Sequence, residues 1–77
     1  MDAREIALLL RTLISEYRDR TNGQGPKHIY ASADVFASLK GEGDPLLALK
    51  ATAAGYTFGN VAIEPKPTQA LPFVLRP

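Results

Sequence analysis

Few side chains in this 77-residue chain could take part in catalysis, because it has one histidine and no cysteine. The residue types of a Ser-His-Asp triad are present in His28, Ser32 and any of eight carboxylates. Such a triad is recognised by its geometry, and two residues on one short segment do not supply it. The missing cysteines exclude thiolate chemistry, and a single histidine argues against a histidine-based zinc site. We therefore expect no catalytic residues, no cofactor and no metal ion, and hence a protein that is not an enzyme.

Two glycine pairs have the outward look of phosphate-binding loops, Gly-Gln-Gly at 23–25 and Gly-Glu-Gly at 41–43. Neither pair is followed by the Gly-Lys-Ser/Thr of a P-loop, and neither joins a strand to a helix as a Rossmann turn does. Glycine is also the residue that ends helices and forms tight turns. We interpret both pairs as turn and helix-cap glycines.

A row of arginines near the N-terminus is the best candidate for a binding surface. Arginine recurs there every seven residues, close to two helical turns, so these side chains share one side of a helix. Their long stems could simply cover apolar surface on a solvated face. They could instead bind an acidic protein or a phosphate backbone, and a leucine among them favours a protein partner. The row consists of Arg4, Leu8, Arg11, Ser15 and Arg18.

The charge balance argues against nucleic acid as a partner. Nine basic residues against eight acids leave a net charge of +1, whereas nucleic-acid-binding modules are usually strongly basic. No aromatic residues are interleaved with the arginines, as a surface for single strands would require. No apolar run approaches the roughly 20 residues that cross a membrane. We expect one domain over residues 1–77, with a core that supplies only ~3–5 kcal/mol, so that forming a homo-oligomer would add stability.

Residues 2–20 are expected to form the amphipathic helix that carries the arginines. Asp2 can cap its first turn, and Glu5 stands three residues later, as in a capping box. Apolar residues recur at helical period on another side of this helix. Asn22 or Gly23 is suited to the left-handed conformation that follows a helix. The apolar stripe comprises Ile6, Leu9, Leu10, Leu13, Ile14 and Tyr17.

Two shorter helices and a strand are expected in the middle of the chain. Residues 26–32 alternate in polarity, which predicts a strand. Ser32 can then cap a helix over residues 33–40, with an apolar face of Val35, Phe36 and Leu39. Asp44 followed by Pro45 is a strong helix start, and it predicts a helix from 46 to 54 that Gly55 ends. That run is short and rich in alanine, so it needs tertiary contacts to persist.

The last third of the chain is expected to be mostly strand. Residues 56–64 are aromatic and β-branched, and Gly59-Asn60 within them could be a two-residue hairpin turn or a bulge. Residues 65–70 are expected to form a turn. Residues 71–75 are expected to form a final strand, which Pro72 places at an edge of the sheet. An edge strand can pair with another chain, so Leu71, Phe73 and Leu75 join the candidate contact residues.

This order of elements predicts an α+β fold with two layers. The long N-terminal helix is expected to pack on a small mixed or antiparallel sheet, together with one or two further short helices.

Two segments carry a family resemblance. Residues 26–40 (PKHIYASADVFASLK) and 58–65 (FGNVAIEP) resemble parts of the axial domain of tailed-phage major capsid proteins. In that domain a strand ends in a small residue before a short helix, and an aromatic-Gly step later leads into a β-branched strand. The chain lacks the arm, extended loop and spine helix of a shell-forming subunit, so we do not expect it to build a shell alone. A bulge at Gly59-Asn60 would support this resemblance, and a hairpin would weaken it.

Absent catalytic chemistry and this resemblance together predict a non-enzymatic phage-type structural or interaction protein. It would act through contacts with protein partners, such as virion proteins or itself, in the virion or the host cytoplasm. A small phage-encoded inhibitor or regulator of a host or defence protein is the alternative. A second alternative is weak binding of nucleic acid through the arginines.

Overall fold

The structure is a computed structural model that describes residues 2–45 and 47–77. Within them the chain forms α1 (Ala3–Arg20), β1 (His28–Ser32), α2 (Ala33–Lys40), β2 (Lys50–Thr52), β3 (Gly55–Phe58), β4 (Val61–Lys66) and β5 (Phe73–Arg76). This confirms the predicted α+β class, with a long N-terminal helix, a second short helix and a mixed sheet.

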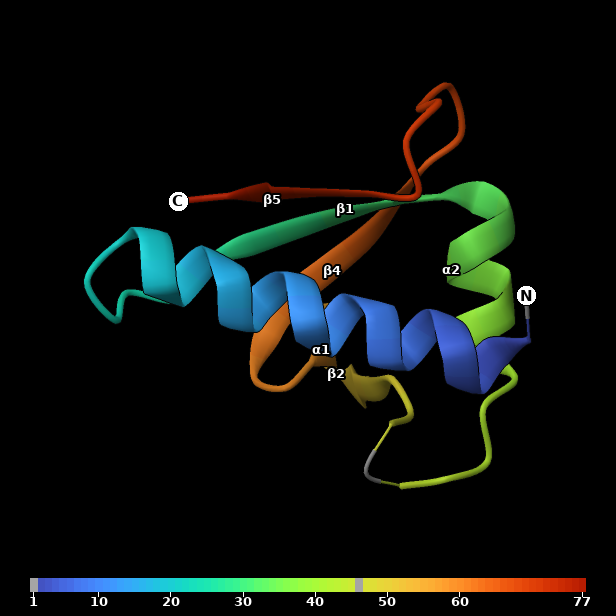
Figure 1. Ribbon diagram of the computed structural model, residues 1–77. Coiled ribbons are helices and arrows are strands. Elements are labelled where there is room, and N and C mark those ends of the chain that lie inside the picture. The colour runs from blue at the N-terminus through green and yellow to red at the C-terminus, as the bar shows by residue number, and fades with distance from the viewer. Residues whose placement is uncertain (1, 46) are drawn as a thin grey trace.

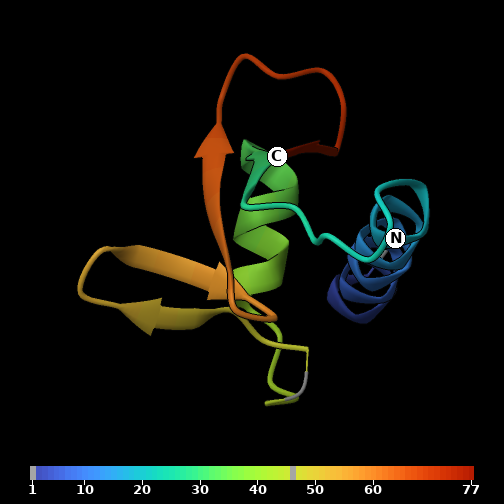
Figure 2. The ribbon, with the colours of Figure 1, turned by 90° about the vertical axis from the view of Figure 1, so that its left-hand side faces the viewer.

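The strands form one five-stranded sheet in the order β2-β3-β4-β1-β5. The central neighbours β1 and β4 are parallel, and the other neighbours are antiparallel. Both helices lie on one side of this sheet (Figures 1 and 2). The core fills the space between the two layers. Its buried side chains are Ile6, Ala7, Leu10, Ile29, Ala31, Phe36, Leu39, Leu47, Phe58, Val61, Ile63 and Phe73.

Helix α1 begins and ends where the sequence predicts. The Asp2 carboxylate accepts a hydrogen bond from the Glu5 backbone N–H at 2.8 Å, which satisfies a free donor of the first turn. After the last turn Asn22 and Gly23 have φ of 57° and 89°, and the Gly23 N–H donates to the Arg18 carbonyl. Of the predicted stripe, only Ile6 and Leu10 are buried, and Ala7 is buried beside them. The remaining stripe residues, Leu9, Leu13, Ile14 and Tyr17, are half-buried.

Strand β1 and helix α2 also match the prediction, apart from one cap. Ile29 and Ala31 are completely buried and alternate with half-buried neighbours. Phe36 and Leu39 anchor α2 in the core. Ser32 has the extended backbone of an N-cap, but its side chain makes no capping hydrogen bond, contrary to our expectation. Its own backbone N–H donates to the Pro72 carbonyl, which ties the start of α2 to the sheet.

The predicted helix over 46–54 is wrong in the part of it that the structure describes; Leu46 lies outside the described residues. Asp44 does start a turn, since its carbonyl accepts hydrogen bonds from the N–H groups of residues 47 and 48. The chain then extends into β2, which pairs with β3 through a tight turn before Gly55. The short run has a weak helical preference, and pairing with β3 satisfies its backbone groups instead.

Gly59-Asn60 is a hairpin turn. Phe58 is paired directly with Val61, which leaves two residues in the loop. Gly59 and Asn60 have φ of 55° and 67°. Two positive φ angles define a type I′ turn, whose twist matches that of the flanking strands. This outcome weakens the resemblance to the capsid axial domain.

Strand β5 is an edge of the sheet, as predicted, but it starts later than expected. It covers Phe73–Arg76, while Leu71 and Pro72 belong to the connection from β4. Pro72 has no backbone N–H to contribute, so regular pairing begins after it. Phe73 is 7% exposed and lies in the core, so its side chain is not on a contact surface.

Gly59→Ala is expected to lower the free energy of unfolding by about 1–2 kcal/mol, because a side chain is disfavoured at positive φ. No atom lies within 4 Å of the added Cβ, so backbone strain is the cause. Urea unfolding followed by circular dichroism measures the loss. Gly43→Ala is the control: its surroundings are equally open and its φ is not positive. It should keep or slightly raise the stability. Equal losses in both variants would contradict the assigned turn.

Candidate functional site

The five residues of the arginine row lie together on the outside of α1, and we call them the α1 surface. All five are exposed, and Leu8 is an unusually exposed apolar residue at 46%. In the part of the chain that the structure describes, Arg4, Arg11 and Arg18 form no ion pair. Their guanidinium groups are therefore available to a ligand.

Three residues of the α1 surface line a depression. Arg11, Ser15 and Arg18 border a hollow of about 380 Å³. Its other wall is formed by Phe58 and Gly59, at the turn between β3 and β4. In Figure 1 this turn (orange) passes beneath the middle of α1. Two guanidinium groups and a hydroxyl beside an aromatic ring can bind a carboxylate or phosphate through several donors.

Gly25 helps to fix the position of Arg18. A Cβ added at Gly25 would lie 3.2 Å from Arg18 Nε, so the guanidinium runs close over the glycine backbone. This packing limits the freedom of the side chain. A site with restrained donors loses less conformational entropy when a ligand binds.

The candidate contact residues at the edge strand, Leu71, Phe73 and Leu75, differ in how far their side chains are buried. Leu71 is 62% exposed in the connection before β5. Phe73 is buried, and Leu75 is half-buried and packs against the core. A partner at this edge would therefore meet the backbone of β5 and the side chain of Leu71.

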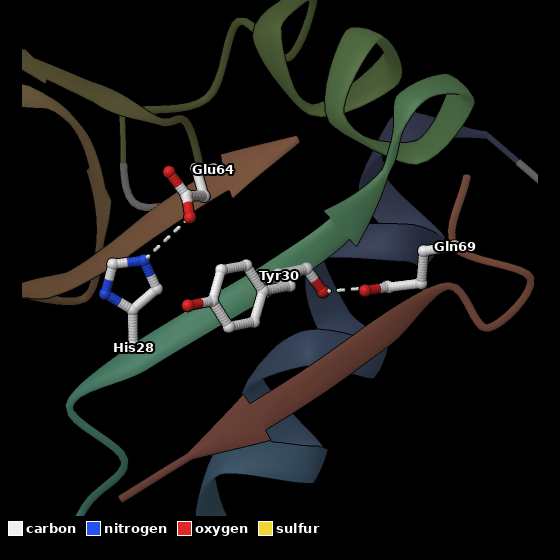
Figure 3. Close-up of polar contacts among 4 residues, drawn as sticks. All are labelled: His28, Tyr30, Glu64 and Gln69. Atoms are coloured by element: carbon white, nitrogen blue, oxygen red, sulfur yellow. Dashed lines mark hydrogen bonds and ion pairs between the residues drawn. The ribbon is translucent and has the colours of Figure 1, made fainter. Parts of the chain in front are cut away.

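The sheet face opposite the helices carries a second group of polar residues, of which only His28 was considered from the sequence (Figure 3). His28 Nε2 lies 3.4 Å from Glu64 Oε1, a distance at which the two form an ion pair when the histidine is protonated. The His28 ring is also tilted against Tyr30, with centroids 4.8 Å apart. Lys66 Nζ lies 4.8 Å from the centroid of the Tyr30 ring, within range of a cation–π contact. The polar alternation of β1 was a signal for this face, but its partners on β4 depend on the register.

Gln69 fastens the connection between β4 and β5 to the same face. Its side-chain Nε2 donates to the Tyr30 carbonyl at 3.0 Å and to the Leu71 carbonyl at 2.8 Å. Figure 3 shows the Tyr30 contact. Beside it is a hollow of about 460 Å³, lined by Tyr30, Lys66, Thr68, Gln69, Val74 and Arg76.

The suspected triad is not assembled. His28 and Ser32 are four residues apart on β1, which corresponds to roughly 13 Å along a strand. The carboxylate beside His28 belongs to Glu64, and this pair stands on the open sheet face. Among residues 2–45 and 47–77 there is no group of three or more His, Asp or Glu placed to hold a metal ion.

A scan against models of known protein families finds no match, and searches of curated proteins and of solved structures find none either. No helix in the described part of the chain is long and apolar enough to cross a membrane.

Gln69→Glu is expected to lower the free energy of unfolding by about 1–3 kcal/mol. The carboxylate cannot donate, so the two carbonyls each lose a hydrogen bond and face a negative charge. Chemical unfolding gives the total loss, and amide hydrogen exchange should locate faster opening in β5. Thr68→Val is the control, because Thr68 lines the same hollow without making these bonds. Unchanged exchange in β5 would contradict the anchoring role of Gln69.

Proposed function

We propose that this chain is a non-enzymatic interaction protein that binds an acidic segment of a protein partner through the α1 surface. The observation that carries the proposal is the depression in which Arg11, Ser15 and Arg18 meet the β3–β4 turn. Unpaired, exposed arginines attract carboxylates, and the exposed Leu8 adds an apolar contact at the other end of the row. A protein segment with acidic and apolar side chains fits both features.

The setting we propose is a tailed phage, where the chain is associated with the virion or its head. The resemblance of residues 26–40 to the capsid axial domain supports this setting, and the hairpin at Gly59-Asn60 counts against it. The proposal therefore rests mainly on the surface. A protein that associates with the virion needs to bind its partners and needs no catalysis. A site built from arginines, a serine and a leucine suits that role.

Reversing two charges is expected to abolish binding. A decaglutamate peptide serves as a simple acidic probe, and its affinity should fall at least tenfold, about 1.4 kcal/mol, in the Arg11→Glu/Arg18→Glu variant. Isothermal titration calorimetry measures this. Arg20→Glu is the control for Arg18→Glu alone, which changes the charge by the same amount, because two helical positions place Arg20 about 200° around α1 from Arg18. Equal losses in these two single variants would mean that overall charge, not the depression, governs binding.

Two further measurements separate the partner classes. Co-purification of the tagged chain with particles, lost in the double variant, is the result expected for a virion protein. Association with one host enzyme and none with particles would instead favour an inhibitor. A single-stranded oligonucleotide that binds more tightly than the acidic peptide, with affinity falling steeply as salt rises, would overturn the proposal.

A further inference from the structure

The two edges of the sheet are protected to different degrees. Strand β2 has three residues, all exposed, and begins with Lys50. Short strands and lysines are devices that discourage pairing with another chain. Strand β5 is one residue longer; Phe73, Val74 and Leu75 are uncharged, and its one charged residue, Arg76, stands at its end. Strand β5 is therefore the edge that would pair more readily with a strand of another chain.

One hydrogen bond shows which residues of β5 direct their backbone groups toward β1 and which direct them outward. The Ser32 N–H donates to the Pro72 carbonyl at 3.1 Å, so the backbone of Pro72 points toward β1. Alternate residues of a strand point the same way, so Val74 also faces β1, while Phe73 and Leu75 direct their N–H and carbonyl groups outward. Neither residue forms a backbone hydrogen bond beyond the sheet ladder within the described chain. In Figure 1, β5 lies along the outer margin of the sheet beyond β1.

We propose that β5 pairs with β5 of a second copy of this chain, antiparallel and around a two-fold axis at Val74. Phe73 of each copy would then exchange two backbone hydrogen bonds with Leu75 of the other. Val74 would lie opposite Val74 as a non-hydrogen-bonded pair, the closer of the two pair types. The result would be one continuous sheet that runs through both copies. This inference does not depend on the α1 surface.

A second copy suits this edge because the register leaves no like charges opposed. In that register Arg76 faces Pro72 of the other copy, and the two valines meet at the centre. β-branched residues in directly opposed positions stabilise antiparallel pairs. The exposed Leu71 would come next to Pro77 of the second copy and lose exposed apolar area. A small domain with a limited core gains stability from such an association.

Sedimentation equilibrium of the full chain over a range of concentrations tests the proposal. The mass should rise reversibly from 8.3 kDa to twice that value, because only Phe73 and Leu75 of each copy offer outward backbone groups and the interface is therefore small. Val74→Asp and Val74→Lys should each remain at the single-chain mass, because like charges would be opposed on the axis. An equimolar mixture of the two variants should recover the doubled mass. Val74→Thr, which keeps the β-branch, should dimerise like the native chain.

Circular dichroism and thermal unfolding of each variant establish that it is folded. A native chain that keeps the single-chain mass at every concentration would overturn the proposal, as would folded Asp and Lys variants that fail to pair. If the variants do not fold, the native chain still decides the matter through amide exchange. Protection of the Phe73 and Leu75 N–H groups should increase with concentration, and constant protection would contradict the dimer. The Arg11→Glu/Arg18→Glu variant should dimerise normally, which separates this test from that of the proposed function.

Discussion

The structure depends on the pairing of β1 on both of its sides. This strand is parallel to β4 and antiparallel to β5, and it places Ile29 and Ala31 fully inside the core. The same pairing sends His28 and Tyr30 to the open face and leads directly into α2. Without β1, strand β5 would have no neighbour in the sheet, and the helices would have no central surface on which to pack.

Local signals in the sequence were sufficient for the first half of the fold. These signals act over a few residues, so they can be recognised in the sequence without a structure. They are the capping pair Asp2 and Glu5, the apolar stripe of α1 and the alternation around Ile29. Residues 44–54 were misread because Asp44-Pro45 is a true turn signal, while the extended path that follows is decided by pairing with β3. The choice between a turn and a bulge at Gly59-Asn60 likewise required the position of the paired strand.

In the candidate site, too, some features follow from local sequence and others depend on how distant strands pair. Helical period alone placed Arg11, Ser15 and Arg18 on one side of α1, but it could not show that the β3–β4 turn completes a depression there. The contacts of His28 with Glu64 and of Lys66 with Tyr30 join residues more than 30 positions apart. They follow from the parallel register of β1 and β4. Phe73 was named as a contact residue because an edge strand can pair with another chain, whereas its side chain packs in the core.

The parallel arrangement also sets the order in which the molecule can be completed during its synthesis. Both strands that flank β1 come from residues 61–76, while β1 itself is made at residues 28–32. The helices can form early, but Ile29 and Ala31 stay exposed to water until the later residues have left the ribosome. Closing such distant contacts is slow compared with local folding. The nascent chain therefore passes through a stage with an unpaired apolar strand, during which chaperone binding would be most useful.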